Sequence, residues 1–321
     1  MDIFKANPIQ FFFILDILSA ILTIAGLCLF ETISSIDNAI INAEVLTTMA
    51  HWAKRWFLTW GLFLAVFVIR GLLPWLIIWM ATPSLGPIGA LTATFSNDPA
   101  VTAAIEESAP ILLMGGGTFL VFLFLNWIFL EEKNYGLRGE CYIASKGVWF
   151  YAVISILLAA LVWFGLSANP LMAFSAVVGS TAFFIVHGFR QNAEEQERKM
   201  MGGTMSDWSK IFYLEVIDAT FSIDGVLGAF AFTLSVPLII IGSGLGAVVV
   251  RQMTISNVDR IKRYLFLKNG AMYSILVLGS IMILDGFGFH IPAWLSPIAT
   301  FGIVGFFYAK SIRNMPPGNA A

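Results

Sequence analysis

Residues 11–41 read FFFILDILSAILTIAGLCLFETISSIDNAII. Residues 11–30 of this stretch are almost entirely apolar, and a helix of roughly 20 such residues crosses the hydrocarbon core of a bilayer. The carboxylates Glu31 and Asp37 follow directly, where a charged group is costly and marks a candidate functional site. The stretch therefore predicts a membrane helix that leads into a polar site.

The composition extends this prediction to the whole chain. Of the 321 residues, 58% are hydrophobic and 12% are charged, whereas soluble domains carry about 25% charged residues. Apolar runs long enough to span a bilayer recur along the sequence, and the short alternating segments of a membrane β-barrel do not occur. We expect an all-α, polytopic membrane protein in a lipid bilayer, without a nucleic-acid partner.

Nine apolar segments are expected to span the membrane. They are 11–30 (with a polar continuation to 49), 57–80, 111–130, 148–166, 170–189, 211–234, 236–250, 266–284 and 294–310. Short turns, such as the one at Ser167–Pro170, force some neighbouring spans to be antiparallel. The whole chain, 1–321, is expected to form a single transmembrane domain.

Basic residues lie almost entirely on one side of this predicted bundle. Of the 18 lysines and arginines, all except Lys5 and Arg70 fall in five segments that nine spans place on the same side: 51–56, 131–147, 190–210, 251–268 and 310–321. Basic loops of membrane proteins stay in the cytoplasm. We therefore predict a multi-pass protein of the inner or plasma membrane, with its amino terminus outside and its carboxyl terminus in the cytoplasm.

A second motif repeats the first. DATFSIDGVLG at 218–228 aligns with ETISSIDNAII at 31–41, and both give an acid, three residues, then Ser-Ile-Asp. The motif helices are the first and sixth spans, so they run in opposite directions, as in the inverted repeats of many secondary transporters. We predict a first repeat at 11–132, linking helices and a cytoplasmic loop at 133–207, and a second repeat at 208–321.

The spacing within each motif limits which side chains share a helix face. At 100° per residue, one stripe of the first motif helix carries four polar residues: Glu31, Ser35, Asn38 and Asn42. Asp37 points about 120° away from this stripe, and Asp224 bears the same relation to Asp218. Both acids of a motif can reach one ion only if the helix unwinds between them. We therefore expect non-helical backbone near 34–38 and 221–225.

The two motifs together offer a hard, oxygen-rich ligand set for a metal cation: Glu31, Ser35, Asp37, Asn38, Asp218, Ser222 and Asp224. Such oxygens favour Mn²⁺, Ca²⁺ or Mg²⁺ over zinc or copper, for which Cys or His ligands would be expected. A secondary group lies around this set: Asn42, Arg70, Glu215 and Arg251. Glu215 is either a further ligand or a residue near the cytoplasmic mouth. In an alternative interpretation, the carboxylates form structural ion pairs with Arg70 and Arg251.

Two glycine clusters predict close helix packing. Gly242, Gly244 and Gly246 formally fit a dinucleotide-binding fingerprint, but they lie inside an apolar span without the strand that this fingerprint requires. Gly115–Gly117 is interpreted in the same way.

At the carboxylate motifs the chain resembles the TerC family of integral membrane proteins, and most of all its subgroup described as a domain of unknown function. The matching stretches are ETISSIDNAIINAEVL (31–46), RWFLTWGLFLAVFVIRGLLPWLI (55–77), YLEVIDATFSIDGVLGAFAFT (213–233) and FLKNGAMYSI (266–275). The resemblance implies the broader cation-exporter superfamily, with manganese export in several relatives and tellurium-resistance naming in others. It carries a ligand role onto five residues: Glu31, Asp37, Asn38, Asp218 and Asp224. The chain departs from the subgroup at Lys268, Asn269 and Met272, where acid and histidine are common.

We therefore expect a transporter that exports a divalent cation through a carboxylate site between the two repeats. Mn²⁺ is favoured, with Ca²⁺ or Mg²⁺ as further candidates, and no resident cofactor is expected. The alternative is a non-transporting membrane scaffold or a metallation factor for secreted proteins. An enzyme is not expected, because neither an HExxH nor a GxSxG motif occurs. A homo-oligomer or an assembly with other membrane proteins is left open.

Overall fold

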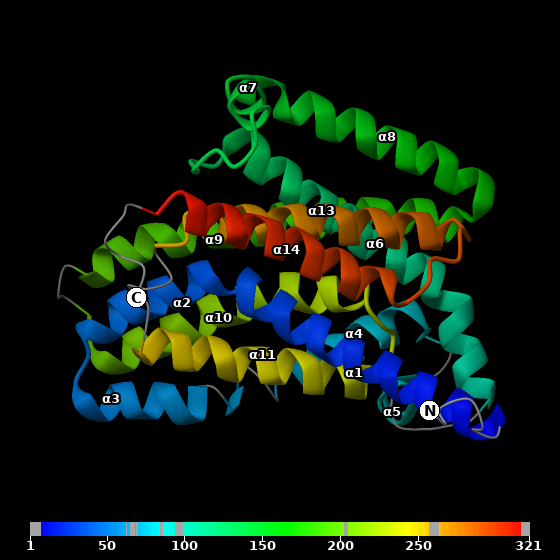
Figure 1. Cartoon of the computed structure of the whole chain (residues 1–321), viewed down its shortest axis with the longest axis horizontal. Coiled ribbons are helices and arrows are strands. Elements are labelled where there is room, and N and C mark those ends of the chain that lie inside the picture. Colours follow the sequence, from blue (N-terminus) through cyan, green and yellow to red (C-terminus); the bar gives the residue numbers. More distant parts are fainter. Residues whose placement is uncertain are drawn as a thin grey trace, which may run out of the picture.

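The computed structural model describes residues 8–61, 63–64, 68, 70–83, 86–93, 99–201, 205–256 and 263–315, and these residues form helices without strands (Figure 1). The elements in chain order are α1 (Pro8–Ser34), α2 (Ile36–Thr47), α3 (His51–Trp56), the π-helical segment η2 (Phe57–Gly61), α4 (Arg70–Ala81), α5 (Gly86–Ala93), α6 (Pro99–Leu130), α7 (Glu140–Ala144), the 3₁₀ turn η5 (Gly147–Trp149), α8 (Phe150–Ala168), α9 (Pro170–Met201), α10 (Asp207–Ala229), α11 (Val236–Ser256), α13 (Leu267–Gly286) and α14 (Leu295–Arg313). The prediction of an all-α fold is confirmed.

Seven helices of the described residues are long and apolar enough to cross a membrane: α1, α6, α8, α9, α11, α13 and α14. Two of the nine expected spans are not among them. The segment 57–80 begins with η2 and ends with α4. Several residues between these two elements are outside the described residues. The segment 211–234 corresponds to α10, whose acidic residues lower its mean hydropathy, although α10 packs inside the bundle against α2, α6 and α9. The chain is thus a polytopic, helical membrane protein.

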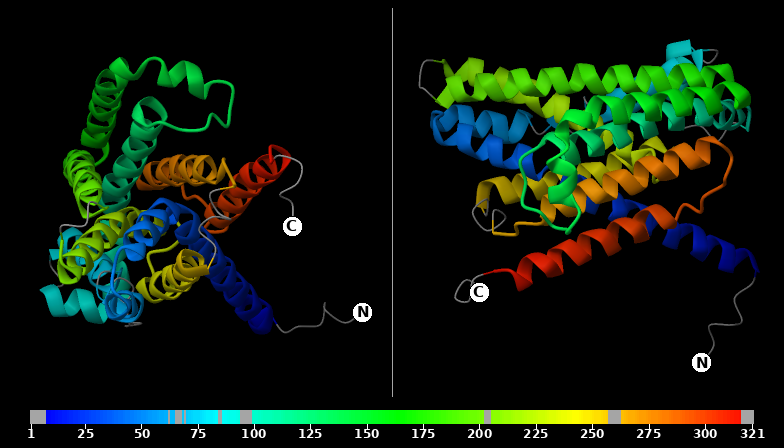
Figure 2. Two further views of the ribbon diagram at one scale, coloured as in Figure 1. Left: turned by 90° about the vertical axis from the view of Figure 1, so that its left-hand side faces the viewer. Right: turned by 90° about the horizontal axis from the view of Figure 1, so that it is seen from above.

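Two apolar helices show how the bundle meets its surroundings. In an 18-residue apolar window of α6, within Glu107–Leu130, 83% of the residues are buried, and seen end-on α6 lies between α9 and α13 (Figure 2). In the corresponding window of α8, within Gly147–Ala168, only 17% of the residues are buried, although this helix is about as apolar. An apolar helix that is left uncovered is typical of a surface in contact with lipid.

The glycine clusters pack helices closely, as predicted. A Cβ on Gly115 would lie 2.5 Å from the Ser175 hydroxyl of α9, and one on Gly117 would lie 2.8 Å from the Gly279 carbonyl oxygen of α13. A Cβ on Gly246 of α11 would likewise lie 2.8 Å from a carbonyl oxygen of α1. Small residues at these points let the helix backbones approach one another, as is common inside membranes.

The two motif helices differ in continuity. The first is interrupted at Ser35, between α1 and α2, but backbone hydrogen bonds still join Ser35 N to Glu31 O (3.1 Å) and Ala39 N to Ser35 O (2.9 Å). This is a bend rather than an unwound segment. The second motif lies in α10, which is helical throughout 221–225, so the expected break there is wrong. Residues 221–225 hold no proline, and a helix can accommodate their one glycine.

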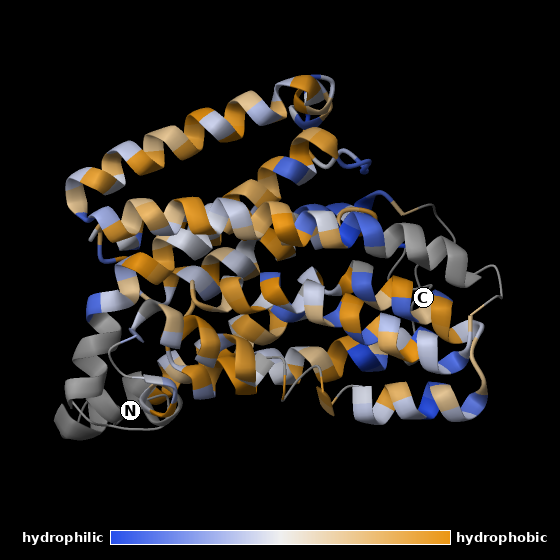
Figure 3. Ribbon diagram, turned by 180° about the vertical axis from the view of Figure 1, so that it is seen from behind, coloured by the Kyte–Doolittle hydropathy of each residue, from blue (hydrophilic) through white to orange (hydrophobic). Residues whose placement is uncertain are grey.

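Polar residues gather towards the end of the bundle that includes α3, whereas apolar residues dominate its middle (Figure 3). This distribution fits helices that run across a bilayer. The assignment of that end to the cytoplasm stays a prediction from the basic residues.

Candidate functional site

A small polar cavity lies where α1, α2, η2, α10 and α11 meet. Its volume is about 40 Å³, which is room for an ion or a few waters, since one water needs roughly 10–15 Å³. Both motif helices contribute to its polar lining, which consists of Glu31, Ser35, Asn38, Asn42, Asp218, Ser222, Arg251 and Thr254. We call it the small cavity.

The first motif helix presents its polar stripe to the small cavity. Glu31, Ser35, Asn38 and Asn42 all line it, as expected from 100° per residue. Glu31 is 1% exposed, and its Oε1 accepts a 2.5 Å hydrogen bond from Ser35 Oγ, one helical turn further on. The bend at Ser35 therefore coincides with a serine that binds the motif carboxylate.

The second motif contributes Asp218, which the first motif helix holds in place. Asp218 Oδ1 accepts hydrogen bonds from Asn38 Nδ2 (2.5 Å) and Asn42 Nδ2 (2.9 Å). The amide oxygens of Asn38 and Asn42 are buried and have no hydrogen-bond partner among the described residues. Because buried polar atoms nearly always have a partner, such oxygens are typical of a site for a water or a cation.

Arg251 supplies the positive charge beside this cavity. Its guanidinium donates to the Phe57 carbonyl oxygen of η2, and its Cζ lies 4.8 Å from the centre of the Phe57 ring. Glu215 does not line the cavity, and its carboxylate instead lies against Gly61 of η2. Both carboxylate oxygens of Glu215 are buried without a hydrogen-bond partner among the described residues.

Asp224 is separated from the other motif acids. It lies six residues after Asp218 on an unbroken helix, so it points about 120° away from it. Asp224 lines a second cavity of about 590 Å³, which we call the large cavity, and it forms an ion pair with Arg190 of α9. The structural ion pair considered as an alternative is therefore seen for Asp224, but its partner is neither Arg70 nor Arg251.

The structure assembles only part of the predicted ligand set. Glu31, Ser35, Asn38, Asp218 and Ser222 line the small cavity. The side chains of Asp37 and Arg70 lie outside the described residues. Over the part of the chain that is described, no group of three or more His, Cys, Asp or Glu side chains is placed to hold a metal ion. The small cavity thus offers two carboxylates supplemented by neutral oxygens.

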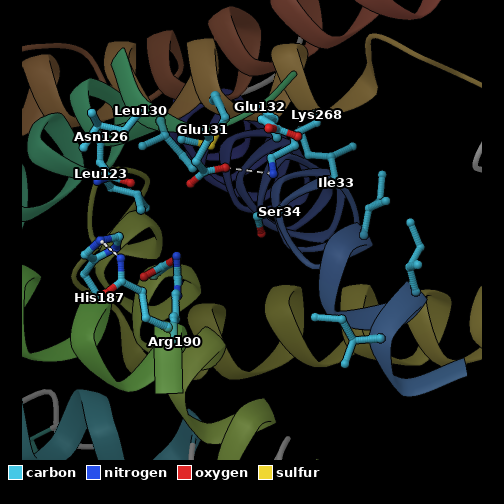
Figure 4. A pocket seen from close by; sticks show the side chains of 18 residues that line it. Ile33, Ser34, Leu123, Asn126, Leu130, Glu131, Glu132, His187, Arg190 and Lys268 are labelled. Carbon is cyan, nitrogen blue, oxygen red and sulfur yellow. Dashed lines mark hydrogen bonds and ion pairs between the residues drawn. The ribbon is translucent and has the colours of Figure 1, made fainter. Parts of the chain in front are cut away.

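The large cavity contains functional groups that the sequence did not single out (Figure 4). Arg190 and His187 lie on one side of it, and a 2.9 Å ion pair between Lys268 and Glu131 lies on the other. In the sequence, Arg190 indicated only which side of the membrane is basic, and Lys268 was noted besides only as a departure from the family subgroup. Their position at the end of an apolar span gave no sign of a partner on another helix.

Comparison with known proteins gives a family but no further relative. A family described as "Protein of unknown function (DUF475)" matches residues 36–315, a range that includes the whole second motif. No curated protein and no solved structure matches the chain. Because the match covers most of its length, the chain belongs to this DUF475 family.

Proposed function

We propose that this protein is a membrane transporter that exports a hard divalent cation through the small cavity, and that it is related to the TerC family. Mn²⁺ is the favoured cation. The observation that carries the proposal is the buried oxygen set around this cavity, made of the carboxylates of Glu31 and Asp218 and the unpartnered amide oxygens of Asn38 and Asn42.

The charge of the cavity favours a cation. Glu31 and Asp218 contribute two carboxylates and Arg251 one guanidinium, so the described side chains of the ionised lining carry an excess negative charge. Buried carboxylates are costly unless they are paired or ligating. Carboxylate, amide and hydroxyl oxygens without a Cys or His favour Mn²⁺, Mg²⁺ or Ca²⁺ over softer metals.

Transport, rather than binding alone, is supported by the position of the site. The small cavity lies between the two motif helices, which belong to the two predicted inverted repeats. In transporters of that design, movement of one repeat against the other exposes a fixed site to each side of the membrane in turn. The direction of transport is taken from the resemblance to cation exporters.

The test is Mn²⁺ flux into liposomes that contain the purified protein and a Mn²⁺-quenched dye. We expect flux with the unaltered protein and none with Asp218→Asn. Glu44→Gln is the matched control, because it removes one negative charge from an exposed position on α2. Mn²⁺ binding without flux would favour a scaffold or a metallation factor. If the protein shows no Mn²⁺ binding and no flux, the proposal is refuted.

A further inference from the structure

The ion pair in the large cavity occupies a carboxylate of the second motif. Arg190 Nη2 contacts Asp224 Oδ2, and the two side chains are only 15% and 10% exposed. The repeated sequence motif places Asp224 where the first motif has Asp37. A partly buried arginine therefore holds one acid of the motif that otherwise serves the small cavity.

Asp224 is only half satisfied by this arginine. Its second oxygen, Oδ1, is buried and has no hydrogen-bond partner among the described residues. An arginine that serves purely as a structural partner commonly binds both oxygens of a carboxylate in a fork. Asp224 thus keeps one carboxylate oxygen without a partner in the described part of the chain, while it lines a cavity of about 590 Å³, which has room for a hydrated ion.

The remaining charges of the large cavity do not repel a cation. Lys268 is paired with Glu131 at 2.9 Å on the opposite wall, where both side chains are 36% exposed, and Glu132 adds a further acid (Figure 4). Among the charged side chains in the lining, Asp224, Glu131 and Glu132 outnumber Arg190 and Lys268. The cavity therefore favours a positive ion over an anion.

A close contact links the two cavities. A Cβ on Gly225 would lie 2.7 Å from Glu31 Oε2, so the Glu31 carboxylate of the small cavity rests against the backbone next to Asp224. A cation at Asp224 is thus one residue along α10 from the point where Glu31 touches that helix.

From these contacts we infer that Asp224 is a second binding position for a divalent cation, and that Arg190 occupies it as a tethered cation until the ion displaces it. This inference rests on the proposed function, because it places the second position next to the helix segment that Glu31 of the small cavity contacts. No covalent step is involved: one ionic contact of Asp224 is exchanged for another.

The experiment is a Mn²⁺ titration of the purified full-length protein, followed by the electron paramagnetic resonance signal of free Mn²⁺. Arg190→Gln removes the competing cation, so we expect about tenfold tighter binding or an additional bound Mn²⁺, the size of effect that one close charge pair produces. The double variant Arg190→Gln/Asp224→Asn should lose this gain. Arg138→Gln is the matched control, since it changes the net charge equally at an exposed position.

The inference is overturned if folded Arg190→Gln binds Mn²⁺ as Arg138→Gln does, or if the gain persists without Asp224. Should Arg190→Gln fail to fold, Arg190→Lys replaces it, and a smaller gain in Mn²⁺ affinity is expected. An Arg190→Lys variant with unchanged Mn²⁺ affinity would then contradict the inference. Asp218→Asn separates the two proposals. If it binds Mn²⁺ as tightly as the unaltered protein, the proposed function fails, whereas the Arg190 comparison still reports on Asp224 alone.

Discussion

The two motif helices share one sequence pattern but form different bonds. In the first, Ser35 Oγ donates to the carboxylate of Glu31, whereas in the second, Ser222 Oγ donates to the main-chain carbonyl oxygen of Asp218 at 2.7 Å. Glutamate is one methylene longer than aspartate, so its carboxylate reaches the hydroxyl one turn further on. The shorter Asp218 is instead bound by amides from the other helix. A repeated motif therefore does not imply repeated contacts.

The motifs also differ in where their acids point. The first motif helix bends at Ser35, and the second is continuous and turns Asp224 into the large cavity. Glu31 and Asp218 thus share the small cavity, one from each motif, while Asp224 pairs with Arg190. The comparison assigns the motif acids different roles that depend on their surroundings.

The largest expected effect concerns the inversion of the two halves and is all-or-none. Reporter domains fused at Ser96 and at Glu195 should report opposite sides of the membrane, because the basic segments place only the second in the cytoplasm. If the same reporter is active at both sites, the predicted topology is wrong, and the two motif helices cannot be treated as inverted copies of one another.

Next in size is the loss of either acid of the small cavity. Glu31→Gln and Asp218→Asn should each weaken Mn²⁺ binding about a hundredfold, since removing one partner of a buried charge interaction costs about 2–5 kcal/mol. Titration calorimetry measures this, with Glu44→Gln as control. If these acids are instead structural partners of Arg251, Asp218→Asn should unfold the protein and added Arg251→Gln should restore it.

A smaller effect is expected where the two motif helices touch. Gly225→Ala places a methyl group against the Glu31 carboxylate, and overpacking of this kind costs about 1–3 kcal/mol, or roughly thirtyfold in cation affinity if all of it displaces Glu31. Gly305→Ala on α14 is the control, because its Cβ would meet nothing within 4 Å. Equal Mn²⁺ affinity in both variants would show that Glu31 does not need this position.

The smallest effects distinguish the two serines. Ser35→Ala removes a hydrogen bond to a carboxylate, worth about 1.5 kcal/mol or roughly tenfold in affinity. Ser222→Ala removes a hydrogen bond to a helical carbonyl oxygen that is already engaged in the helix, so Mn²⁺ affinity should hardly change. Equal losses in the two variants would indicate that the serines play the same role after all.

The sequence predicted those features that follow from local geometry. The polar stripe through Glu31, Ser35, Asn38 and Asn42 and the divergence of Asp224 depend only on the helical repeat. The packing role of the glycine clusters followed from their position inside apolar spans. Hydropathy indicated the helical membrane fold, but it could not anticipate the π-helical start of the segment at 57–80, where the Phe57 carbonyl group accepts a hydrogen bond from the distant Arg251.

The partners of the site residues could not be predicted in the same way. Arg190 meets Asp224 only because α9 and α10 pack together, and nothing within either motif specifies that arrangement. The shared face of Asn38, Asn42 and Asp218 likewise depends on how two distant helices cross. Contacts between residues far apart in sequence are set by packing, about which a single sequence carries little direct information.

The most direct test of the central claim is a crystal structure of the protein with Mn²⁺, with anomalous diffraction recorded near the manganese absorption edge. We predict an anomalous peak in the small cavity, roughly 2.0–2.6 Å from oxygens of Glu31 and Asp218, the range for hard divalent cations. Absence of a peak in that cavity at saturating Mn²⁺, with these carboxylates arranged as described, would contradict the account.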